Sequence, residues 1–274
     1  EAVKVVTEPL VPPLDHQILV KTVYAGVNAT DVLTYDIPHG AGYEALGVVE
    51  AVGKHISDFT IGQTVLFLFG DDLNLRAYAE YIYAKSEELT PVPSLKPEFI
   101  ALPVNAMTAS IGLDVAGFIK KTDKVLVTAA AGGTGLMAVQ WAKKKGSYVI
   151  GMTSTEEKTK LLKELGTDRV INYKTENLDE VLTEEFPEGV DVIWETIGGQ
   201  VLENLYNHLA PMGRLVIVGG TPGYKDEDNS DNIIKIPDLA LRILAKSQVK
   251  ENSMELILWS EEWSICILDV TLEK

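Results

Sequence analysis

The sequence predicts an α/β protein in which a β-rich first region precedes a doubly wound parallel sheet. The chain has 274 residues, enough for two domains of roughly 150 residues each. Its first part carries short β-branched and aromatic runs between turn residues, and its second part alternates strand-like with helix-like segments. We therefore predict a first domain over residues 1–107, a second over 108–247, and a divergent acidic tail over 248–274.

The first region reads as a set of short strands. Each apolar run is bounded by Gly, Asp, Asn or Pro, which are the residues that commonly end strands. The runs are HQILVKTVYAGV (16–27), LGVVEAVG (46–53), TVLFLF (64–69) and AYAEYIYA (77–84). The proline-rich stretch that follows, residues 87–104, is predicted to be a connector.

From about residue 108 the predicted strands and helices alternate. The strands cover 124–130, 147–153, 168–173, 190–196 and 213–220, and the helices between them cover 133–145, 156–165, 178–185 and 201–209. Such alternation implies a parallel sheet with helices on both faces. The last stretch, from about Val249, carries six acids and two lysines and is predicted to form one amphipathic helix or a loose end.

The composition argues against several classes of function. The net charge of −16 disfavours a nucleic-acid partner, which needs a basic surface. No stretch approaches the roughly 20 uninterrupted apolar residues that a membrane helix needs. The single cysteine, Cys266, rules out an internal disulfide and fits a reducing compartment. We expect a cytoplasmic protein, and the sequence leaves mitochondrial and peroxisomal locations open.

A turn of small residues joins the first strand of the second region to its helix. The segment Ala130–Gly135 (AAGGTG) has small residues at the first, third and sixth places of a G-x-G-x-x-G frame, with Ala for the first Gly. Between a strand and a helix this pattern is typical of dinucleotide binding, because N–H groups at the helix start meet the pyrophosphate. The alternative is a tight turn that binds no ligand.

The end of the next strand bears on which dinucleotide is bound. A free ribose 2′-hydroxyl usually meets an Asp or Glu there, but this strand ends in GMTS with no acid at its tip. Glu156 and Glu157 follow, where they suit the first turn of a helix. Lys158 stands four residues after Ser154, one helical turn on, so both can face a 2′-phosphate. This favours NADPH over NADH; the alternative for Lys158 is an ordinary exposed lysine.

These motifs resemble the medium-chain dehydrogenase/reductase superfamily, and within it the branch of quinone oxidoreductases (zeta-crystallin) and prostaglandin reductases. The resembling stretches are GVNATDV, GYEALGVVEAVG, PVPSLKPEF, VLVTAAAGGTG, INYKTE, FPEGVDVIWETIGG and GRLVIVGGTPGY. They span about Gln17 to Lys246. The resemblance implies a GroES-like β-barrel catalytic domain, incomplete here, followed by a Rossmann domain that binds NADPH.

The resemblance also implies roles for individual residues. It gives the phosphate cradle to Gly132–Gly135, the 2′-phosphate to Lys158 and Tyr173, and the nicotinamide side to Thr196 and the segment Val218–Tyr224. Together with Ser154, the cofactor-binding candidates are Gly132, Gly133, Thr134, Gly135, Lys158, Tyr173, Thr196, Gly219 and Tyr224. The catalytic candidates are Tyr224, near the substrate oxygen, and Asn28, in the GVN turn. The alternative for Tyr173 and Tyr224 is that they are ordinary half-buried tyrosines.

The zinc-dependent branch of the superfamily needs Cys, His and acidic ligands around an open tetrahedral site. Its first ligand would fall near Asn28 to Asp31, where the sequence has NATD, and its histidine would fall at Tyr43, before Glu44. The four histidines show no ligand spacing to one another: His16, His39, His55 and His208. We predict a zinc-free protein with no metal ligands.

Without a Lewis acid, a conjugated carbonyl is an easier substrate than a plain ketone or alcohol. Charge that appears on its oxygen can be stabilised by a neutral donor, a role that the resemblance gives to Tyr224. We predict an NADPH-dependent reductase of the C=C bond of conjugated enones, of the 15-oxo-prostaglandin 13-reductase type. The alternatives are an NADPH-dependent quinone reductase and a catalytically idle NADPH-binding or structural protein.

Three departures from the family pattern bear on activity and assembly. The segment between Asn28 and Glu44 is short, and the first family strand is clipped at Glu1. After Ser247, VKENSM replaces an apolar dimer-edge strand, and the chain stops before the barrel is finished. We expect a truncated or alternatively spliced product with unpaired strand edges. A homodimer is possible, but its edge strand is expected to be lost.

Overall fold

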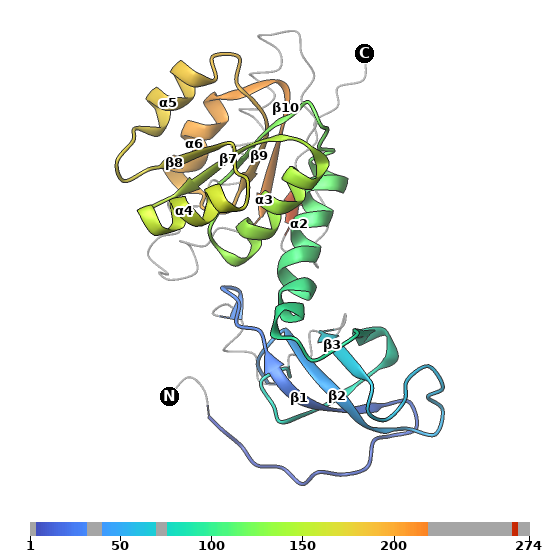
Figure 1. Ribbon diagram of the computed structural model, residues 1–274. Helices are drawn as coiled ribbons and strands as arrows, with labels where there is room; N and C mark the ends of the chain where they lie inside the picture. Colours follow the sequence, from blue (N-terminus) through green and yellow to red (C-terminus); the bar gives the residue numbers. More distant parts are fainter. Residues whose placement is uncertain (1–3, 32–39, 70–75, 219–264, 268–274) are drawn as a thin grey trace. The chain divides into compact units, whose positions relative to one another are not determined.

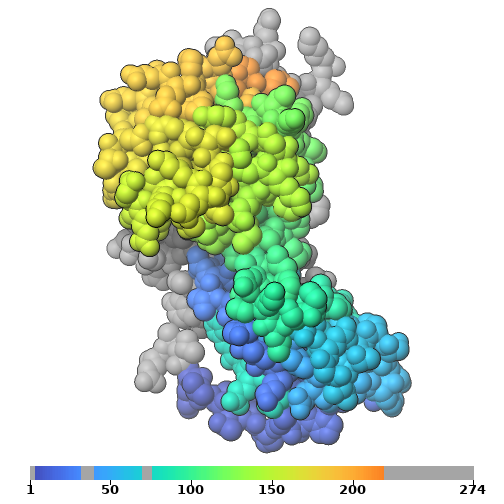
Figure 2. All heavy atoms as spheres, viewed as in Figure 1, coloured from blue at the N-terminus to red at the C-terminus, as the bar shows by residue number. Residues whose placement is uncertain are grey.

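The computed structural model describes residues 4–31, 40–69, 76–218 and 265–267 of the chain (Figure 1). The chain divides into two compact units, Glu1–Asn105 and Ala106–Lys274. These are unit 1 and unit 2, whose atoms are drawn as spheres in Figure 2.

Unit 1 is built on an antiparallel sheet of five strands in the order β4-β1-β2-β3-β5. The strands are β1 (Ile18–Ala25), β2 (Glu44–Val52), β3 (Thr64–Leu68), β4 (Tyr81–Ala84) and β5 (Leu89–Pro91). A short 3₁₀ turn, η1 (Ser86–Glu88), precedes β5. The core of the unit is formed by buried residues of these strands, among them Ile18, Val20, Val49, Val65, Phe67 and Ile82. The β-rich first region predicted from the sequence is therefore confirmed.

The boundary between the units falls within one helical stretch. This consists of η2 (Pro97–Ala101), η3 (Leu102–Ala106), α2 (Met107–Ile111) and η4 (Gly112–Ala116). The prediction of a connector over residues 87–104 is wrong for its last part, because a proline at the first position of a helix costs no hydrogen bond.

The same stretch, Pro97–Ala116, is the one helix among the described residues that is long and apolar enough to cross a membrane by length and composition. The core helices of soluble proteins pass the same test. Leu113 and Ala116, near its end, are buried in the core of unit 2.

Unit 2 contains a sheet of six strands in the order β11-β10-β9-β6-β7-β8. The strands are β6 (Lys124–Val127), β7 (Tyr148–Thr153), β8 (Arg169–Asn172), β9 (Val190–Glu195), β10 (Leu209–Val218) and β11 (Ile265–Ile267). The helices are α3 (Gly133–Lys145), α4 (Glu156–Glu164), α5 (Leu178–Glu185) and α6 (Gly199–Asn207). All neighbouring strands from β6 to β10 are parallel, which confirms the doubly wound sheet.

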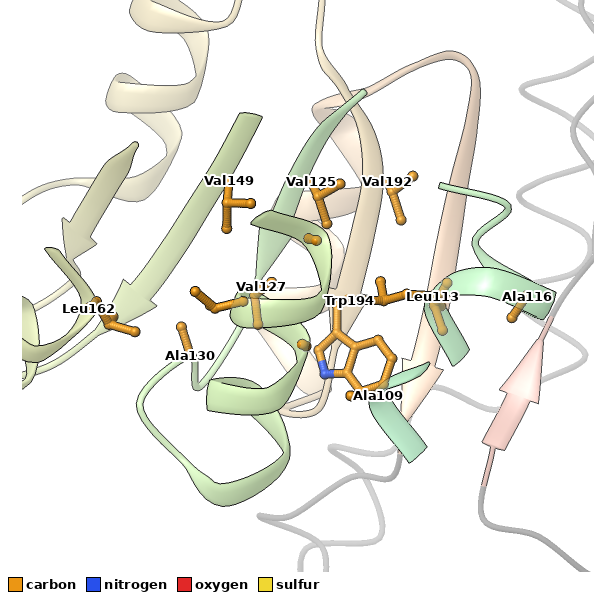
Figure 3. Packing of buried hydrophobic residues seen from close by; sticks show 14 of the residues in the cluster. Ala109, Leu113, Ala116, Val125, Val127, Ala130, Val149, Leu162, Val192 and Trp194 are labelled. Carbon is orange, nitrogen blue, oxygen red and sulfur yellow. The ribbon is translucent and has the colours of Figure 1, made fainter. Parts of the chain in front are cut away.

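Alternate residues of each strand point to opposite faces of the sheet, and helices cover both faces. On one face Val125 and Val127 pack with α3, α4 and the end of the helical stretch. On the other face Leu126 packs with α5 and α6. Figure 3 shows the first cluster around Trp194. A Cβ on Gly112 would lie 2.6 Å from the Trp194 ring, so this contact depends on glycine.

The tail was predicted to be an amphipathic helix or a loose end, and residues 265–267, the part of it that the structure describes, form neither. Its described residues form β11, which pairs antiparallel with β10 through Val216–Ile267 and Val218–Ile265. The physical reason is that the N–H and C=O groups along a strand edge need partners, and β11 supplies them along Val216–Val218.

Candidate functional site

The strand order of unit 2 creates a switch point between β6 and β9. From β6 the chain winds outward through β7 and β8, then returns to place β9 on the other side of β6. Helices that follow β6 and β9 therefore diverge to opposite faces of the sheet. In open parallel sheets, ligands bind outside the carboxyl ends of the strands at such a point.

The glycine turn that the sequence singled out lies at this point. Ala129 follows β6 with φ 43°, and the N–H of Gly132 donates to the carbonyl of Ala129 over 2.8 Å. A Cβ on Gly135 would lie 2.4 Å from that same carbonyl oxygen. Gly135 therefore permits the close approach of helix to strand. A Cβ on Gly132 would meet it only at 3.2 Å, and Gly132 and Gly133 are exposed.

The N-terminus of α3 carries no negative group of its own. Gly132 is its N-cap, no side chain caps it, and no acidic residue stands in its first turn. Thr134 lies in the same turn. The first N–H groups of a helix lack intrahelical acceptors and carry partial positive charge. The start of α3 is therefore suited to an anion.

The next two helices differ from α3. The N-cap Thr155 of α4 accepts a hydrogen bond from the Lys158 N–H, and Glu156 and Glu157 stand in its first turn. The N-cap Asn177 of α5 accepts two N–H bonds, with acids again in the first turn. Their own side chains therefore satisfy these termini.

Two threonine hydroxyls bridge β6 and β9 at the switch point. The N–H of Thr196 donates to Thr128 Oγ1 over 2.9 Å, and the two Oγ1 atoms lie 3.1 Å apart. Thr196 is the residue that the resemblance placed beside the cofactor. Thr128 was not predicted as a site residue, because the predicted strand over 124–130 included it, whereas β6 ends at Val127.

Glu195, at the end of β9, is a buried residue that the sequence reasoning missed. Its Oε1 accepts the N–H groups of Ile197 at 2.8 Å and Gly198 at 3.0 Å. Gly198 has φ 80°, which glycine adopts readily. Burial raises the pKa of Glu195 above its usual value of 4.5, against these hydrogen bonds, which lower it. The carboxyl group thus holds the residues just before α6, whose N-cap is Gly198 and whose first turn carries no acid.

The ends of β7 and β8 bring together the other predicted cofactor residues. The N–H of Tyr173, just after β8, donates to the carbonyl of Thr153 over 3.1 Å. Ser154 follows Thr153, and Tyr173 is 44% exposed. Lys158 is exposed, and its ammonium makes no ion pair with any residue that the structure describes.

The helical spacing predicted between Ser154 and Lys158 is not observed. Helix α4 begins at Glu156 with Thr155 as its N-cap. Ser154 therefore lies outside the helix, and the spacing argument does not apply to it.

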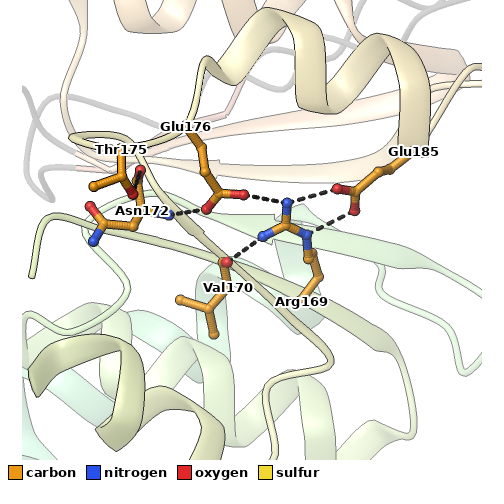
Figure 4. Close-up of polar contacts among 6 residues, drawn as sticks. All are labelled: Arg169, Val170, Asn172, Thr175, Glu176 and Glu185. Carbon is orange, nitrogen blue, oxygen red and sulfur yellow. Dashed lines mark hydrogen bonds and ion pairs between the residues drawn. The ribbon is translucent and has the colours of Figure 1, made fainter. Parts of the chain in front are cut away.

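A salt-bridge cluster fixes the turn that carries Tyr173. Arg169 Nη2 lies 2.6 Å from Glu176 Oε1 and 2.7 Å from Glu185 Oε1 (Figure 4). The other oxygen of Glu176 accepts the Asn172 N–H over 2.8 Å. Hydrogen bonds from the guanidinium lower the pKa of both carboxyls. The charged cluster thus ties the end of β8 to α5.

Gly219 and Tyr224 lie outside the described residues. The nicotinamide and substrate-oxygen roles that the resemblance gives to them therefore stay predictions. The same applies to most of the segment Val218–Tyr224, of which only Val218 is described.

Asn28 belongs to a polar cluster within unit 1. Its amide Nδ2 donates to Glu44 Oε1 over 2.8 Å, and its N–H donates to Asp31 Oδ2 over 2.6 Å. Tyr78 donates its hydroxyl to the same Asp31 oxygen over 2.7 Å, and Glu44 Oε2 accepts the Val104 N–H over 2.8 Å. Asn28 is therefore held by two carboxylates.

Burial sets the electrostatics of this cluster. It raises the pKa of Glu44, with Asp31 adding to the rise and the bonds from Asn28 and Val104 opposing it. Burial also raises the pKa of Tyr78, with the Asp31 carboxylate as the next cause. Tyr78 is thus a neutral donor across the physiological range.

The residues at the expected zinc position do not fit a zinc ion. Asn28 directs a donor N–H₂ group, not a lone pair, at Glu44, and Tyr43 packs edge-on against Phe69 with ring centroids 5.0 Å apart. Among residues 4–31, 40–69 and 76–218, no three His, Cys, Asp or Glu side chains gather as metal ligands.

Two protein families match the chain. Residues 14–94 match the alcohol dehydrogenase GroES-like domain, and residues 133–257 match the family described as zinc-binding dehydrogenase. The two matches fall on units 1 and 2 respectively.

Individual relatives agree with these matches. The chain is 40% identical over 248 residues to prostaglandin reductase-3 of Bos taurus, which covers 87% of this chain and 64% of that protein. It is 35% identical over 247 residues to 2-haloacrylate reductase of a Burkholderia species, covering 84% and 71%. The chain thus spans a little less than two thirds of the length of the bovine relative.

A solved structure gives the same result for the fold. The crystal structure of Escherichia coli quinone oxidoreductase complexed with NADPH matches with a TM-score of 0.76 and 27% identity. The match covers 88% of this chain and 73% of that one.

Proposed function

The chain belongs to the quinone oxidoreductase and prostaglandin reductase branch of the medium-chain dehydrogenase/reductase superfamily, and from this premise we propose that it is an NADPH-dependent, zinc-independent oxidoreductase. The observation that carries the proposal is the start of α3 at the β6–β9 switch point, where the exposed Gly132 and Gly133 carry no side chain and no acid stands in the first turn. A pyrophosphate suits that place.

We assign the 2′-phosphate to the carboxyl ends of β7 and β8. Lys158 supplies the charge, and Ser154 and Tyr173 supply hydroxyl donors. The ending of β7 supports NADPH because its last residue, Thr153, is followed by serine and threonine, with no carboxylate before the helix. Thr196 and Thr128 lie at the nicotinamide side, and Gly219 and Tyr224 complete that side in this proposal.

The reaction that we propose is reduction of the C=C bond of a conjugated enone, of the 15-oxo-prostaglandin 13-reductase type. NADPH, when bound, supplies the hydride that this reduction needs. The chain's part is to bind and orient the substrate, to exclude water, and to donate a hydrogen bond to the carbonyl oxygen through Tyr224. Asn28 and the neutral Tyr78 supply further polar groups within unit 1. The similarity to prostaglandin reductase-3 supports this choice.

The second candidate is an NADPH-dependent quinone reductase, supported by the similarity to the Escherichia coli enzyme. NADPH oxidation followed with a 15-oxo-prostaglandin and with an ortho-quinone in parallel separates the two. Turnover of the quinone alone would overturn the first choice. Tight NADPH binding without turnover of either would leave an idle NADPH-binding protein.

The cofactor assignment is tested by titrating NADPH and NADH against wild type and Lys158→Ala. We expect wild type to prefer NADPH, and Lys158→Ala to lose roughly 10- to 100-fold of NADPH affinity, as one charge-assisted hydrogen bond contributes. Lys160→Ala is the matched control, because Lys160 stands on the same helix and faces Glu164 at 4.0 Å. Equal affinities of wild type for NADPH and NADH would overturn the 2′-phosphate assignment.

We also propose a small-molecule substrate as the partner, with no nucleic acid, and a cytoplasmic location. A homodimer is possible in this proposal, but its apolar edge strand is expected to be lost, because VKENSM stands after Ser247.

A further inference from the structure

Two histidines that lie far apart in the sequence meet at one end of the unit 1 sheet. Nε2 of His16 lies 3.2 Å from Nδ1 of His55, and the ring centroids are 4.5 Å apart with the planes tilted by 51°. Both side chains are exposed. Their separation in the sequence gives no ligand spacing, but the β1–β2 pairing brings together the two turns that carry them.

The two turns hold each other firmly. The N–H of His55 donates to the carbonyl of Asp15 over 2.9 Å, and the N–H of Gly53 donates to the carbonyl of Gln17 over 2.8 Å. A Cβ on Gly53 would lie 2.5 Å from the carbonyl oxygen of Asp15. Only glycine therefore allows this approach, and the distance between the two Cβ positions is set by backbone contacts.

The separation of the two ring nitrogens matches a shared metal ion. Two nitrogens bound at about 2.05 Å lie about 3.3 Å apart on a tetrahedral ion and about 2.9 Å apart on neighbouring square-planar positions. The observed 3.2 Å lies between these values. Neutral imidazole is the commonest metal ligand among side chains, and either exposed ring can turn about its Cβ–Cγ bond to direct both lone pairs at one point.

We propose that His16 and His55 form a two-histidine surface site for a borderline transition-metal cation, Cu²⁺ or Zn²⁺, with water completing the coordination. Asp15 is not assigned as a ligand, because its carboxylate pairs with Lys54 over 2.6 Å. The net charge of the chain, −16, favours cations at its surface. His16 and His55 are not the residues at the zinc position of the zinc-dependent branch, which falls near Asn28 and Tyr43. The proposed metal site is therefore independent of the proposed function.

The test is a titration of the metal-free full chain with Cu²⁺, followed by electron paramagnetic resonance and calorimetry. We expect one Cu²⁺ per chain with nitrogen hyperfine structure from two imidazoles, and weaker binding of Zn²⁺, as the Irving–Williams order requires. His16→Gln and His55→Gln should each lose tenfold or more in affinity. His208→Gln is the control, because its ring pairs with Asp179 over 2.7 Å.

A second measurement separates the site from other copper-binding groups. An ion that ties the two turns together binds only the folded chain and should raise the unfolding temperature of wild type and of His208→Gln. This rise in the unfolding temperature should be absent in His16→Gln and in His55→Gln. Two outcomes would overturn the proposal: equal Cu²⁺ affinity of wild type and His16→Gln, or no binding of Cu²⁺ at up to 100 times the chain concentration. Either would show that the two histidines are only hydrogen-bonded to each other.

Discussion

Two strand-to-helix loops at the same edge of the unit 2 sheet differ in what meets the helix N-terminus. After β6, the start of α3 has a glycine N-cap and no acid in its first turn. After β9, the buried carboxylate of Glu195 accepts the N–H groups that lead into α6. The two loops share strand polarity and flank the same switch point. Both helices begin after a glycine N-cap with no acid in the first turn, so the loops differ in the Glu195 carboxyl group, which stands beside the N–H groups just before α6 and has no counterpart before α3.

The largest expected effect comes from giving α3 the acid that it lacks. Gly133→Asp places a carboxylate in the first turn, where it repels a pyrophosphate by a few kcal/mol if the charges are about 4 Å apart. We expect NADPH affinity to fall roughly 100-fold, while the free energy of unfolding stays level or rises by about 0.3–1 kcal/mol. Fluorescence titration and urea denaturation measure the two quantities. Gly133→Ala is the control. Equal NADPH affinity of Gly133→Asp and Gly133→Ala would contradict the proposal that the start of α3 binds the pyrophosphate.

The second effect tests the backbone of the same loop. Gly135→Val forces a Cβ to within 2.4 Å of the Ala129 carbonyl oxygen, so strand or helix must shift. Overpacking of this kind costs about 1–3 kcal/mol of the free energy of unfolding. Gly132→Ala meets the same oxygen only at 3.2 Å and should cost clearly less. Urea denaturation compares the two, and equal losses would contradict the distinct roles given to these glycines.

The third effect concerns the loop after β9. Glu195→Ala leaves the N–H groups of Ile197 and Gly198 without their acceptor, and we expect the free energy of unfolding to fall by about 1–3 kcal/mol. Because Glu195 accepts the N–H groups just before α6, we do not expect this loop to bind the phosphates. The NADPH affinity of Glu195→Ala should therefore fall far less than that of Gly133→Asp. Thermal and urea denaturation at neutral pH measure the stability. A loss of affinity as large as that of Gly133→Asp would show that the β9 loop also meets the phosphates.

The pH dependence of the same residue follows from its raised pKa. A carboxyl whose pKa is higher in the folded than in the unfolded chain binds more protons when folded, so its stabilising contribution is complete below about 4.5 and is lost as pH rises through the folded pKa. With Glu195→Gln as the non-titrating reference, the free energy of unfolding of wild type should fall relative to the variant over that window. If the difference in the free energy of unfolding between wild type and Glu195→Gln stays constant from pH 4 to pH 8, the raised pKa of Glu195 is contradicted.

Much of unit 2 could be predicted because its signals are local. The apolar runs and the glycine turn gave the strands and the start of α3, and the absence of an acid after β7 could be read directly. Glu195 could not be found in this way, because a glutamate at a strand end reads as a solvent-exposed residue. Its role depends on N–H groups that turn back to it through a positive φ at Gly198.

The long-range contacts of unit 1 were beyond sequence reasoning. Asn28 was named through the resemblance, but its bond to Glu44 joins residues that only the β1–β2 pairing brings together. His16 and His55 meet for the same reason. The helix from Pro97 was missed because proline was read as a connector signal, although at a first helical position it is compatible with a helix.

The smallest expected effect tests what joins the two loops. Thr128→Val keeps the side-chain shape and removes the acceptor of the Thr196 N–H, at 2.9 Å. We expect the free energy of unfolding to fall by about 0.5–1.5 kcal/mol, the net value of one hydrogen bond. Because Thr128 and Glu195 hold neighbouring parts of the β9 loop, combining Thr128→Val with Glu195→Ala should give a non-additive loss, measured by a double-mutant cycle. If the two losses of the free energy of unfolding add strictly, the loop before α3 and the loop before α6 are positioned independently of each other, although they flank one switch point.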